Sequence, residues 1–244
     1  METIDAFLDG KVQLKQGDHG PKGTSDSVLV AAAVPAKSEE TVLDVGTGNG
    51  VISLCLNARV PELKFTGIDC QNDLLILAKK NADFNRANFT PVLADIGVVP
   101  SPIHGKQFHH VVTNPPFYTE PCQRKDDQQA VAYHQKLPLK EWLRFCLRHV
   151  RAKGTLTLIH RAETLPEILS VLDGKLGALE IIPVSSKEGE HAKRVIIRGR
   201  MNSRKPLCLY PPLIMHKKNG ERSIAAEQIL RNGTGIDTVL GLDF

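Results

Sequence analysis

No run of apolar residues in this chain comes near the ~18 that a membrane-spanning helix needs, so we do not expect a membrane protein. The opening residues, METIDAFLDGKVQLKQGD, lack the apolar stretch of a secretory signal peptide. The five cysteines are scattered and include no Cys-x-x-Cys pair, which argues against a structural zinc site and for reduced thiols. We therefore expect a cytoplasmic protein without a bound metal.

The composition is that of an ordinary globular protein, with 41% hydrophobic and 24% charged residues. A length of 244 residues is enough for one large α/β domain with small additions, or for two small domains. Strand-like and helix-like segments alternate after about residue 40, a pattern typical of a parallel sheet covered by helices. We predict seven strands, at 41–45, 63–69, 90–95, 108–114, 154–160, 179–185 and 194–200, and helices at 50–60, 71–86 and 137–150.

Two segments do not fit the alternation. Residues 119–136 are polar and weakly patterned, and we interpret them as a flap. Residues 10–28 contain four glycines and a proline, so we expect a loop that wraps the edge of the sheet. The helix at 137–150 is amphipathic, and its apolar face includes Trp142, which we assign to the core.

Positive charge is concentrated between residues 181 and 220. Nine Lys or Arg face two Glu there, a segment charge of +7 that leaves −3 for the rest of a chain whose net charge is +4. Such a patch is a possible footprint for a polyanion, and the alternative is a solvated basic surface.

The stretch LDVGTGNG places Gly46, Gly48 and Gly50 between a predicted buried strand and a helix start. Glycines in this position allow a sharp turn and the close approach of a ligand. The dinucleotide spacing G-x-G-x-x-G fails, because the third position is Val51. Asp44 would repel a phosphate and attract an ammonium group, so the loop favours a cofactor with an ammonium group and no phosphate.

Three aspartates are expected at the carboxyl ends of neighbouring strands. They are Asp44, Asp69, about 20 residues beyond the glycine loop, and Asp95. Ligands of open α/β sheets bind at this edge, where an acid after the second strand can bond ribose hydroxyls and Asp95 can accept from an adenine amino group. The alternative for each single Asp is a helix N-cap.

The stretch VVTNPPFY ends a strand in an unusual way. Two prolines supply no backbone N–H to a ladder, so pairing should stop at Asn114 in a stiff, extended turn. An amide, a carbonyl and the rings of Phe117 and Tyr118 are then presented from fixed backbone. We interpret the turn as a seat for a flat, polar group, and the alternative is a rigid turn with buried aromatics.

The glycine loop, Asp69, Asp95 and NPPF together resemble the class I S-adenosylmethionine-dependent methyltransferases, and among these the enzymes that methylate planar amino groups. The resemblance covers residues from about 20 to 220. It implies a doubly wound, Rossmann-like core at 41–205, an N-terminal extension with a cofactor-contacting loop at 1–40, and a C-terminal extension packed on the core at 206–244.

The resemblance also implies that the cofactor is S-adenosyl-L-methionine. The glycines would frame its methionine part, Asp69 would hold the ribose, and Asp95 with Ile96 would hold the adenine. The expected cofactor-binding residues are Thr24, Asp26, Asp44, Gly46, Thr47, Gly48, Gly50, Asp69, Cys70, Asp95, Ile96 and Asn114.

The Asn-Pro-Pro-Phe turn suits methyl transfer to an amino group conjugated with a ring. Oδ1 of Asn114 and the carbonyl of Pro115 can each accept one N–H, which aims the nitrogen lone pair at the methyl group, and Pro116 keeps these acceptors in place. Phe117, with Tyr118, can stack on the base, a contact worth about 1–3 kcal/mol. The methyl passes in line, and neither a metal nor a covalent enzyme intermediate is required.

The C-terminal half indicates a particular group among these methyltransferases. EGEHAKRVIIRGR and YPPLIMHKKNGERSIAAEQIL are similar to the tail of bacterial tRNA (adenine-N6)-methyltransferases that act on a valine tRNA beside the anticodon. In that family the basic stretch is the RNA-facing side. The resemblance implies phosphate contacts by Arg194, Arg198, Arg200, Lys217 and Lys218.

The sequence departs from that family near its N-terminus. Members usually carry a Gly-Thr-Asp-Gly-like turn that contacts the cofactor, whereas this chain has KGTSDSVLV at 22–30, with Asp26 in the acidic position. This departure affects the assignment of the tRNA substrate more than the assignment of methyl transfer.

Other acceptors and classes stay open. Asn-Pro-Pro-aromatic turns also serve enzymes that methylate guanine N2 of ribosomal RNA or a glutamine amide of release factors, although the latter usually carry a sizeable helical N-terminal domain. A non-catalytic RNA-binding protein with the same fold is a further alternative. The failed dinucleotide spacing disfavours an NAD-dependent oxidoreductase.

Overall fold

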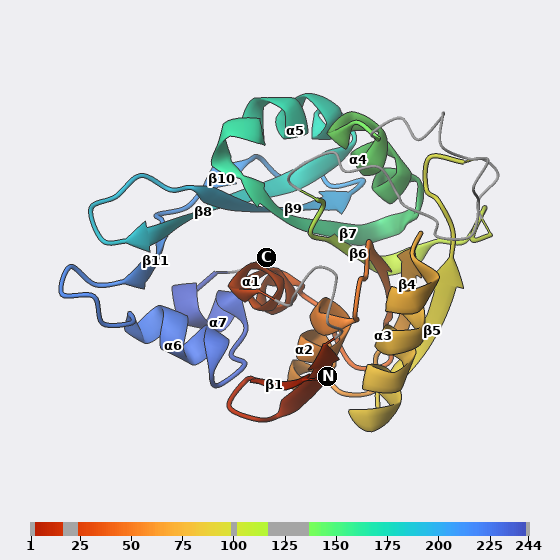
Figure 1. Cartoon of the computed structure of the whole chain (residues 1–244). Coiled ribbons are helices and arrows are strands. Elements are labelled where there is room, and N and C mark those ends of the chain that lie inside the picture. The colour runs from red at the N-terminus through yellow and green to blue at the C-terminus, as the bar shows by residue number, and fades with distance from the viewer. Residues whose placement is uncertain (1–2, 17–23, 99–101, 117–136, 243–244) are drawn as a thin grey trace.

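The computed structural model of the chain describes residues 3–16, 24–98, 102–116 and 137–242. Its centre is a nine-stranded sheet with the strand order β10-β8-β9-β7-β6-β3-β4-β5, and β11 also pairs with β8 (Figure 1). The strands are β3 (Thr41–Val45), β4 (Lys64–Asp69), β5 (Asn88–Leu93), β6 (Phe108–Thr113), β7 (Val150–Arg161), β8 (Leu176–Lys187), β9 (Arg194–Met201), β10 (Cys208–Leu209) and β11 (Leu213–His216).

The seven predicted strands are all present, and β10 and β11 add two short strands beside β8. β3 to β7 pair in parallel, whereas β9 runs antiparallel to both β7 and β8. The expected α/β fold with a mostly parallel sheet is therefore confirmed. Because β3, β4, β5, β6 and β7 run in one direction, their carboxyl ends meet at one edge, which we call the carboxyl edge.

Helices cover both faces of the sheet, and the strands alternate their apolar residues between them. Val42 and Ile196 belong to one core cluster, with α1, α2 and α3, whereas Leu43 and Ile197 belong to the other, with α4 and α5 (Figure 1). Because both faces of the sheet are covered, apolar side chains are buried on both sides of the strands. The helices are α1 (Ser25–Ala33), α2 (Val51–Arg59), α3 (Asn72–Phe84), α4 (Leu139–Arg148) and α5 (Leu165–Leu172), which follows the 3-10 turn Ala162–Thr164.

The C-terminal helices α6 (Ile224–Leu230) and α7 (Ile236–Leu240) pack on the same side as α1. Ala226, Ile229 and Ile236 are fully buried in that core cluster. Ser223 caps α6, because its hydroxyl accepts the backbone N–H of Ala226 at 3.0 Å.

The expectation of a loop at residues 10–28 is wrong for 12–16 and 25–28, and residues 17–23 lie outside the described residues. The strands β1 (Thr3–Phe7) and β2 (Val12–Gln16) form a hairpin, and α1 starts at Ser25. Val12 and Leu14 alternate with polar residues and are buried, a short strand signal that the glycines and the proline nearby obscured. Asn81 on α3 holds β2, because its side-chain amide accepts from the backbone of Lys15 at 2.9 Å and donates to it at 3.0 Å.

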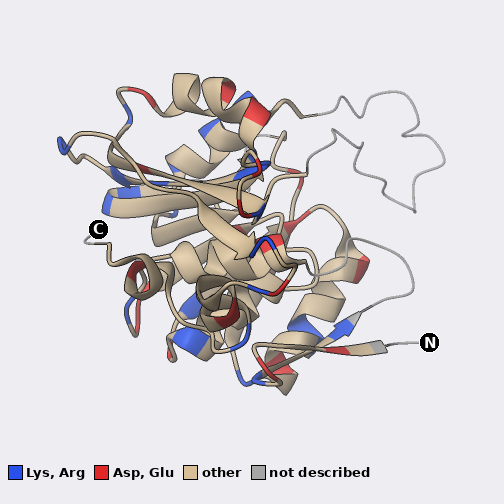
Figure 2. Ribbon diagram, turned by 90° about the vertical axis from the view of Figure 1, so that its left-hand side faces the viewer, with Lys and Arg blue, Asp and Glu red and all other residues tan. Residues whose placement is uncertain are grey.

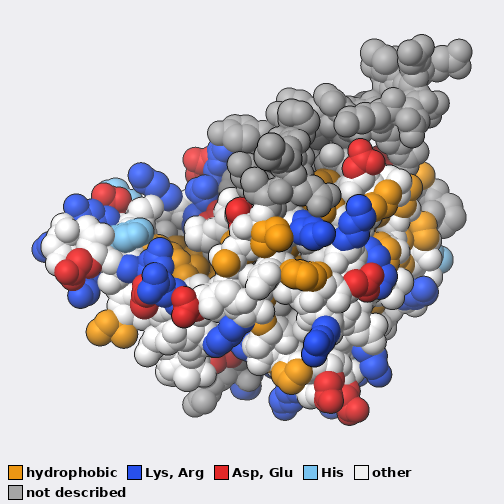
Figure 3. Space-filling model, turned by 60° about the horizontal axis from the view of Figure 1, so that its bottom comes forward, with side chains coloured by type: hydrophobic (Ala, Val, Ile, Leu, Met, Phe, Trp, Pro, Cys, Tyr) orange, Lys and Arg blue, Asp and Glu red, His pale blue; other side chains and the backbone are white. Residues whose placement is uncertain are grey.

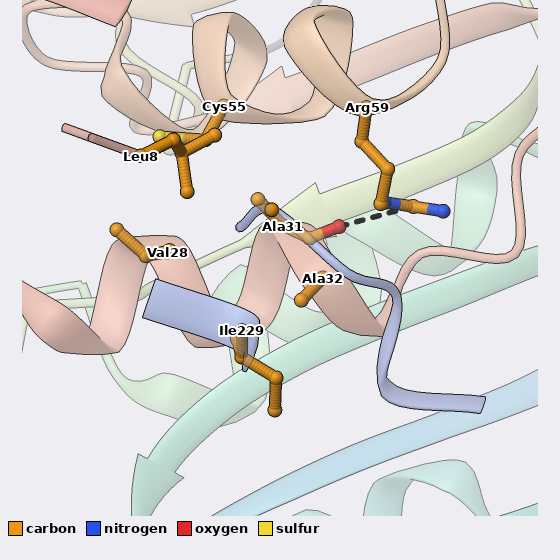
Figure 4. A pocket seen from close by; sticks show the side chains of 8 residues that line it. Leu8, Val28, Ala31, Ala32, Cys55, Arg59 and Ile229 are labelled. Carbon is orange, nitrogen blue, oxygen red and sulfur yellow. Dashed lines mark hydrogen bonds between the residues drawn. The ribbon is translucent and has the colours of Figure 1, made fainter. Parts of the chain in front are cut away.

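A small cavity lies where the hairpin, α1, α2 and α6 meet (Figure 4). Its volume is about 10 Å³, room for about one water molecule. Arg59 reaches into it and donates to the carbonyl of Ala31 at 3.2 Å, whereas its Nε has no partner among the described residues. None of the predicted site residues is among those that line the cavity, Leu8, Val28, Ala31, Ala32, Cys55, Arg59, Ile229 and Gly233.

Candidate active site

The glycine loop connects β3 with α2 at the carboxyl edge, and its backbone needs glycine. Gly46, Gly48 and Gly50 have φ angles of 72°, 55° and 88°, which residues with a Cβ rarely adopt. A Cβ on Gly46 would also come within 2.8 Å of the Trp142 ring, whereas a Cβ on Gly48 would meet nothing within 4 Å. The loop is thus packed on one side and open at Gly48.

Hydrogen bonds tie this loop to the end of β4. The backbone N–H groups of Gly46 and Thr47 both donate to the carbonyl of Ile68, at 2.9 and 3.1 Å. The N–H of Gly48 donates to Oδ2 of Asp69 at 2.9 Å. The glycine loop and the acid predicted to hold the ribose therefore form one rigid unit.

Asp44 is fully buried beneath the loop with half of its carboxylate unused. Oδ2 accepts the hydroxyls of Thr47 at 2.9 Å and Ser53 at 2.7 Å, and Oδ1 has no partner among the described residues. Burial and, to a smaller extent, the negative charge of Asp69 raise the pKa of Asp44 to about 6, although these two hydrogen bonds act in the opposite direction. An ammonium group placed here would satisfy Oδ1 and favour the ionised form.

Asp69 and Asp95 lie at the next two strand ends. Asp69 closes β4, and burial raises its pKa although the N–H groups of Gln71 and Gly48 bond its carboxylate. Asp95 comes two residues after β5 and accepts the N–H of Gly97 at 2.8 Å in a turn. The N-cap residues of α2 and α3 are Gly50 and Gln71. The helix N-cap alternative is therefore wrong for all three aspartates.

The Asn-Pro-Pro turn leaves the sheet beside the glycine loop. Thr113, the last residue of β6, pairs with Val45 of β3, so Asn114 and Gly46 continue from neighbouring strands, which lie ≈4.8 Å apart. Oδ1 of Asn114 is buried and has no partner among the described residues. Pro115 is buried and Pro116 exposed, whereas Phe117, Tyr118 and the flap predicted at 119–136 lie outside the described residues.

Two residues that were not predicted as part of the site support this turn. His160, at the end of β7, hydrogen-bonds the backbone of Pro116, and burial lowers the pKa of its imidazole to about 4. Trp142 of α4 donates its indole N–H to Oγ1 of Thr113 at 2.9 Å. Trp142 is on the inner face of α4 as expected, yet periodicity could not predict that its ring would lie against the glycine loop.

Near α1, Asp26 forms an ion pair with Arg194 at 3.0 Å. These residues were predicted for different roles, Asp26 for the cofactor and Arg194 for RNA. Thr24 is exposed at the N-cap position of α1, and its side chain makes no capping hydrogen bond. Ile96 is partly buried against the core cluster of α4 and α5.

The structure divides the predicted basic patch, and it contradicts the role assigned to Arg198. This guanidinium is fully buried between the carboxylates of Glu180 and Asp237 and donates to the carbonyl of Ala33 at 3.0 Å. Arg198 is therefore a core ion-pair residue and not a phosphate contact. Sequence reasoning missed this because Glu180 and Asp237 lie 18 and 39 residues away along the chain.

Arg200 lies at the other end of β9 from the candidate site. It pairs with Thr155 in the middle of β7 and donates to the carbonyl of Lys153 at 3.1 Å, whereas Arg194 pairs with Arg161 at the carboxyl edge. Arg200 is six positions along the strand from Arg194, about 20 Å. Its phosphate contact therefore stays a prediction, and it would lie away from the carboxyl edge.

Cys70, which follows Asp69, is disulfide-bonded, whereas Cys55, Cys146 and Cys208 are free. The expectation that all cysteines are reduced is therefore wrong for Cys70. In the part of the chain that the structure describes, no group of three or more His, Cys, Asp or Glu could hold a metal ion. No described helix is both long and apolar enough to cross a membrane.

S-adenosylmethionine fits the donor set at the carboxyl edge. Oδ1 of Asp44, which no described residue bonds, can accept from the ammonium group, and Gly48 is open to a ligand. The carboxylates of Asp69 and Asp95 can accept from ribose hydroxyls and an adenine amino group.

Comparisons with solved structures define the class of the fold as that of class I methyltransferases. A predicted O-methyltransferase from Agrobacterium tumefaciens aligns with a TM-score of 0.71 over 86% of this chain and 97% of its own, at 23% identity. A putative class I S-adenosylmethionine-dependent methyltransferase from Listeria monocytogenes aligns with a TM-score of 0.54 over 86% of this chain and 70% of its own, at 16% identity.

The family model of the methyltransferase small domain matches residues 22–181, and the chain belongs to that family. It is a methyltransferase whose methyl donor is S-adenosyl-L-methionine. A tRNA1(Val) (adenine(37)-N6)-methyltransferase from Aeromonas hydrophila is 28% identical over 206 residues, which cover 82% of this chain and 84% of the relative.

Proposed function

We propose that this methyltransferase places a methyl group on the exocyclic N6 amino group of an adenine in RNA, and that the RNA is a tRNA. The observation that carries the proposal is the buried Oδ1 of Asn114, which has no partner in the described part of the chain and lies one strand away from the cofactor loop. A buried carbonyl oxygen without a donor costs about 1–3 kcal/mol, and an amino N–H of the substrate removes that cost. The names of the relatives from Aeromonas, Shewanella and Porphyromonas support adenine N6 and tRNA.

The cofactor would be held by Asp44 at its ammonium group, by the glycine loop along its methionine part, and by Asp69 and Asp95 at its nucleoside. When bound, it supplies a sulfonium methyl group that a nitrogen lone pair can attack. The roles of Thr24, Asp26, Thr47, Cys70 and Ile96 in binding stay predictions.

The residues after β6 prepare the amino nitrogen for attack. Oδ1 of Asn114 and the carbonyl of Pro115 accept its two N–H groups, which draws the lone pair out of conjugation with the ring. The prolines and the bond from His160 to Pro116 hold these acceptors in place. After transfer, the nitrogen loses one proton, which passes to water. We propose that Phe117 and Tyr118 stack on the base.

A basic lobe beyond the carboxyl edge suits a nucleic acid. We define it as residues 185–194, between β8 and β9, and 216–222, after β11, which are joined where His216 pairs with Lys187. The lobe lies at the left of Figure 1, and Lys, Arg and His side chains gather on it in Figure 3. Three Glu oppose its six basic residues, Lys187, Lys193, Arg194, Lys217, Lys218 and Arg222.

Elsewhere on the described chain the charges of both signs are interspersed (Figure 2). The β9 register places the lobe at the end of the sheet where Asn114 lies, because Arg194 pairs with Arg161 at the carboxyl end of β7. RNA phosphates held by Lys217 and Lys218 would therefore lie on the side of the sheet from which the target base enters.

The test is incubation with isotope-labelled S-adenosylmethionine and unmodified total RNA, followed by nucleoside mass spectrometry of size-separated fractions. Labelled N6-methyladenosine in the tRNA fraction is the expected result. Label on guanosine of ribosomal RNA would overturn the adenine assignment and keep methyl transfer to a base. Label only on glutamine of added protein would overturn RNA as the substrate.

A further inference from the structure

The indole of Trp142 contacts both halves of the candidate site. Its N–H donates to Oγ1 of Thr113 at 2.9 Å, and Thr113 directly precedes Asn114. Its six-membered ring lies so close to Gly46 that a Cβ there would be 2.8 Å from Cζ2 and 2.9 Å from Cη2. One side chain therefore joins the residue before the amino-group acceptor to the first glycine of the cofactor loop.

The hydrogen bonds around Thr113 have a fixed direction. An indole nitrogen only donates, and a threonine hydroxyl has one hydrogen to give. That hydrogen goes to the carbonyl of Val45 at 2.8 Å, so Oγ1 accepts from Trp142. The chain Trp142 to Thr113 to Val45 links α4, β6 and β3, and Thr113 and Val45 are fully buried. Loss of any member leaves a buried polar group without its partner.

The segment just before Trp142 contacts a third part of the site. A Cβ on Gly97 would lie 3.4 Å from Cδ1 of Leu137 and 3.2 Å from Oδ1 of Asp95. The N–H of Gly97 is the donor that orients Asp95. Residues 137–142 thus lie against the turn of Asp95 at one end and against Gly46 at the other.

We propose that Trp142 is a positioning residue that sets the distance between the cofactor loop and Asn114, and that its ring forms part of the wall of the cofactor site. The ring packs against Gly46, and the N–H donates to Thr113. One rigid indole therefore fixes the position of the cofactor loop relative to the acceptor at Asn114. This inference rests on the proposed function, because it takes Asn114 as the acceptor of the amino group.

The first test uses the fact that the chain contains one tryptophan. The wild-type protein is titrated with S-adenosylhomocysteine, and tryptophan emission and the heat of binding are recorded on the same samples. A change in emission that follows the calorimetric isotherm is expected. Saturation by calorimetry with unchanged emission would overturn the placement of Trp142 in the wall. Absence of any calorimetric binding would overturn the proposed function together with this inference.

The second test separates positioning from packing. Thr113→Val keeps the shape of the side chain and removes the acceptor of the indole N–H, whereas Thr113→Ser keeps that acceptor. We expect Thr113→Val to lower kcat by about tenfold, the equivalent of ~1.4 kcal/mol, with the Kd of S-adenosylhomocysteine within about twofold of wild type, and Thr113→Ser to restore kcat. Melting by circular dichroism controls for folding.

Trp142→Phe and Thr113→Val together form a double-mutant cycle. Trp142→Phe keeps a ring beside Gly46 and removes the indole N–H. In the double variant with Thr113→Val, the loss in kcat should equal that of either single variant, since both remove the same bond. Wild-type kcat in a folded Thr113→Val protein, or losses that multiply in the double variant, would overturn the positioning role. Either result would leave the proposed function standing, because the wild-type protein would still methylate RNA.

Discussion

Ser53 donates its hydroxyl hydrogen to Oδ2 of Asp44 across 2.7 Å, and the other carboxylate oxygen, Oδ1, is buried without a partner among the described residues. A buried carboxylate with one unbonded oxygen lowers the stability of the ligand-free fold, and it can bind a cationic ligand through that oxygen. Two predictions rest on this arrangement.

The first concerns Asp44→Asn. Because the pKa of Asp44 in the folded, cofactor-free protein is about 6 against an ordinary 3.8, this group lowers stability as the pH rises from about 4 to about 6. At pH 8 the substitution should therefore raise the free energy of unfolding by about 1–2 kcal/mol, as measured by urea denaturation. The same variant should bind S-adenosylhomocysteine at least about tenfold more weakly by calorimetry. Exposed Asp83→Asn is the control, and a stable variant with wild-type affinity would contradict the role.

The second concerns pH. An ammonium ligand binds the ionised carboxylate, so cofactor affinity should fall as Asp44 takes up a proton below about pH 6. The dissociation constant should rise by up to about tenfold per pH unit below that value and stay nearly constant between pH 6.5 and 7.5. Calorimetric titrations at pH 5, 6 and 7 measure this, and equal affinities at pH 5 and 7 would exclude Asp44 as the ammonium partner.

Asn114→Ala should abolish methyl transfer and spare cofactor binding. Oδ1 of Asn114 has no partner among the described residues, so its removal costs the apo protein little. Loss of a positioned polar group that acts on the reacting centre lowers kcat by about 10²–10³. Single-turnover transfer to RNA and calorimetry with S-adenosylhomocysteine separate the two effects. A large loss of cofactor affinity would instead mean that Asn114 mainly holds the cofactor.

The basic lobe can be tested against a matched pair of charges at the opposite edge of the sheet. Lys217→Ala with Lys218→Ala should weaken RNA binding by roughly tenfold and lower the slope of log K against log salt by about 1.5. Arg204→Ala with Lys205→Ala removes the same charge from exposed residues that follow the far end of β9 and should change neither. Equal effects of both pairs would show that binding follows net charge alone.

Replacement of Arg198 should lower the stability of the fold and leave RNA binding unchanged. Its replacement by Met leaves Glu180 buried without its cation, and breaking a buried ion pair costs about 3–5 kcal/mol. Urea denaturation measures the loss, and the salt dependence of RNA binding by the folded variant should equal that of wild type. A reduced slope with unchanged stability would return Arg198 to the RNA surface.

Local sequence signals predicted the seven strands along the chain and the aspartates at or just after the ends of three of them. The loop glycines, Asp44, Asp69 and the Asn-Pro-Pro turn could be recognised because a turn and its strand are only a few residues apart. Local signals could not predict which residues of the basic patch face the site. Arg194, Arg198 and Arg200 lie within seven residues of β9. The β9 register nevertheless places Arg194 at the carboxyl edge and Arg200 near the amino ends, and Arg198 points into the core.

The sequence by itself determined the fold class, the cofactor loop and the acceptor turn, because apolar periodicity, positive φ at glycine and the missing N–H of proline act over a few residues. Only the tertiary structure decided which charges face the substrate and which side chains join the two halves of the site. Arg198 meets Asp237 and Trp142 meets Gly46 across 39 and 96 residues. Such contacts depend on how helices pack on the sheet, and no local pattern encodes that packing.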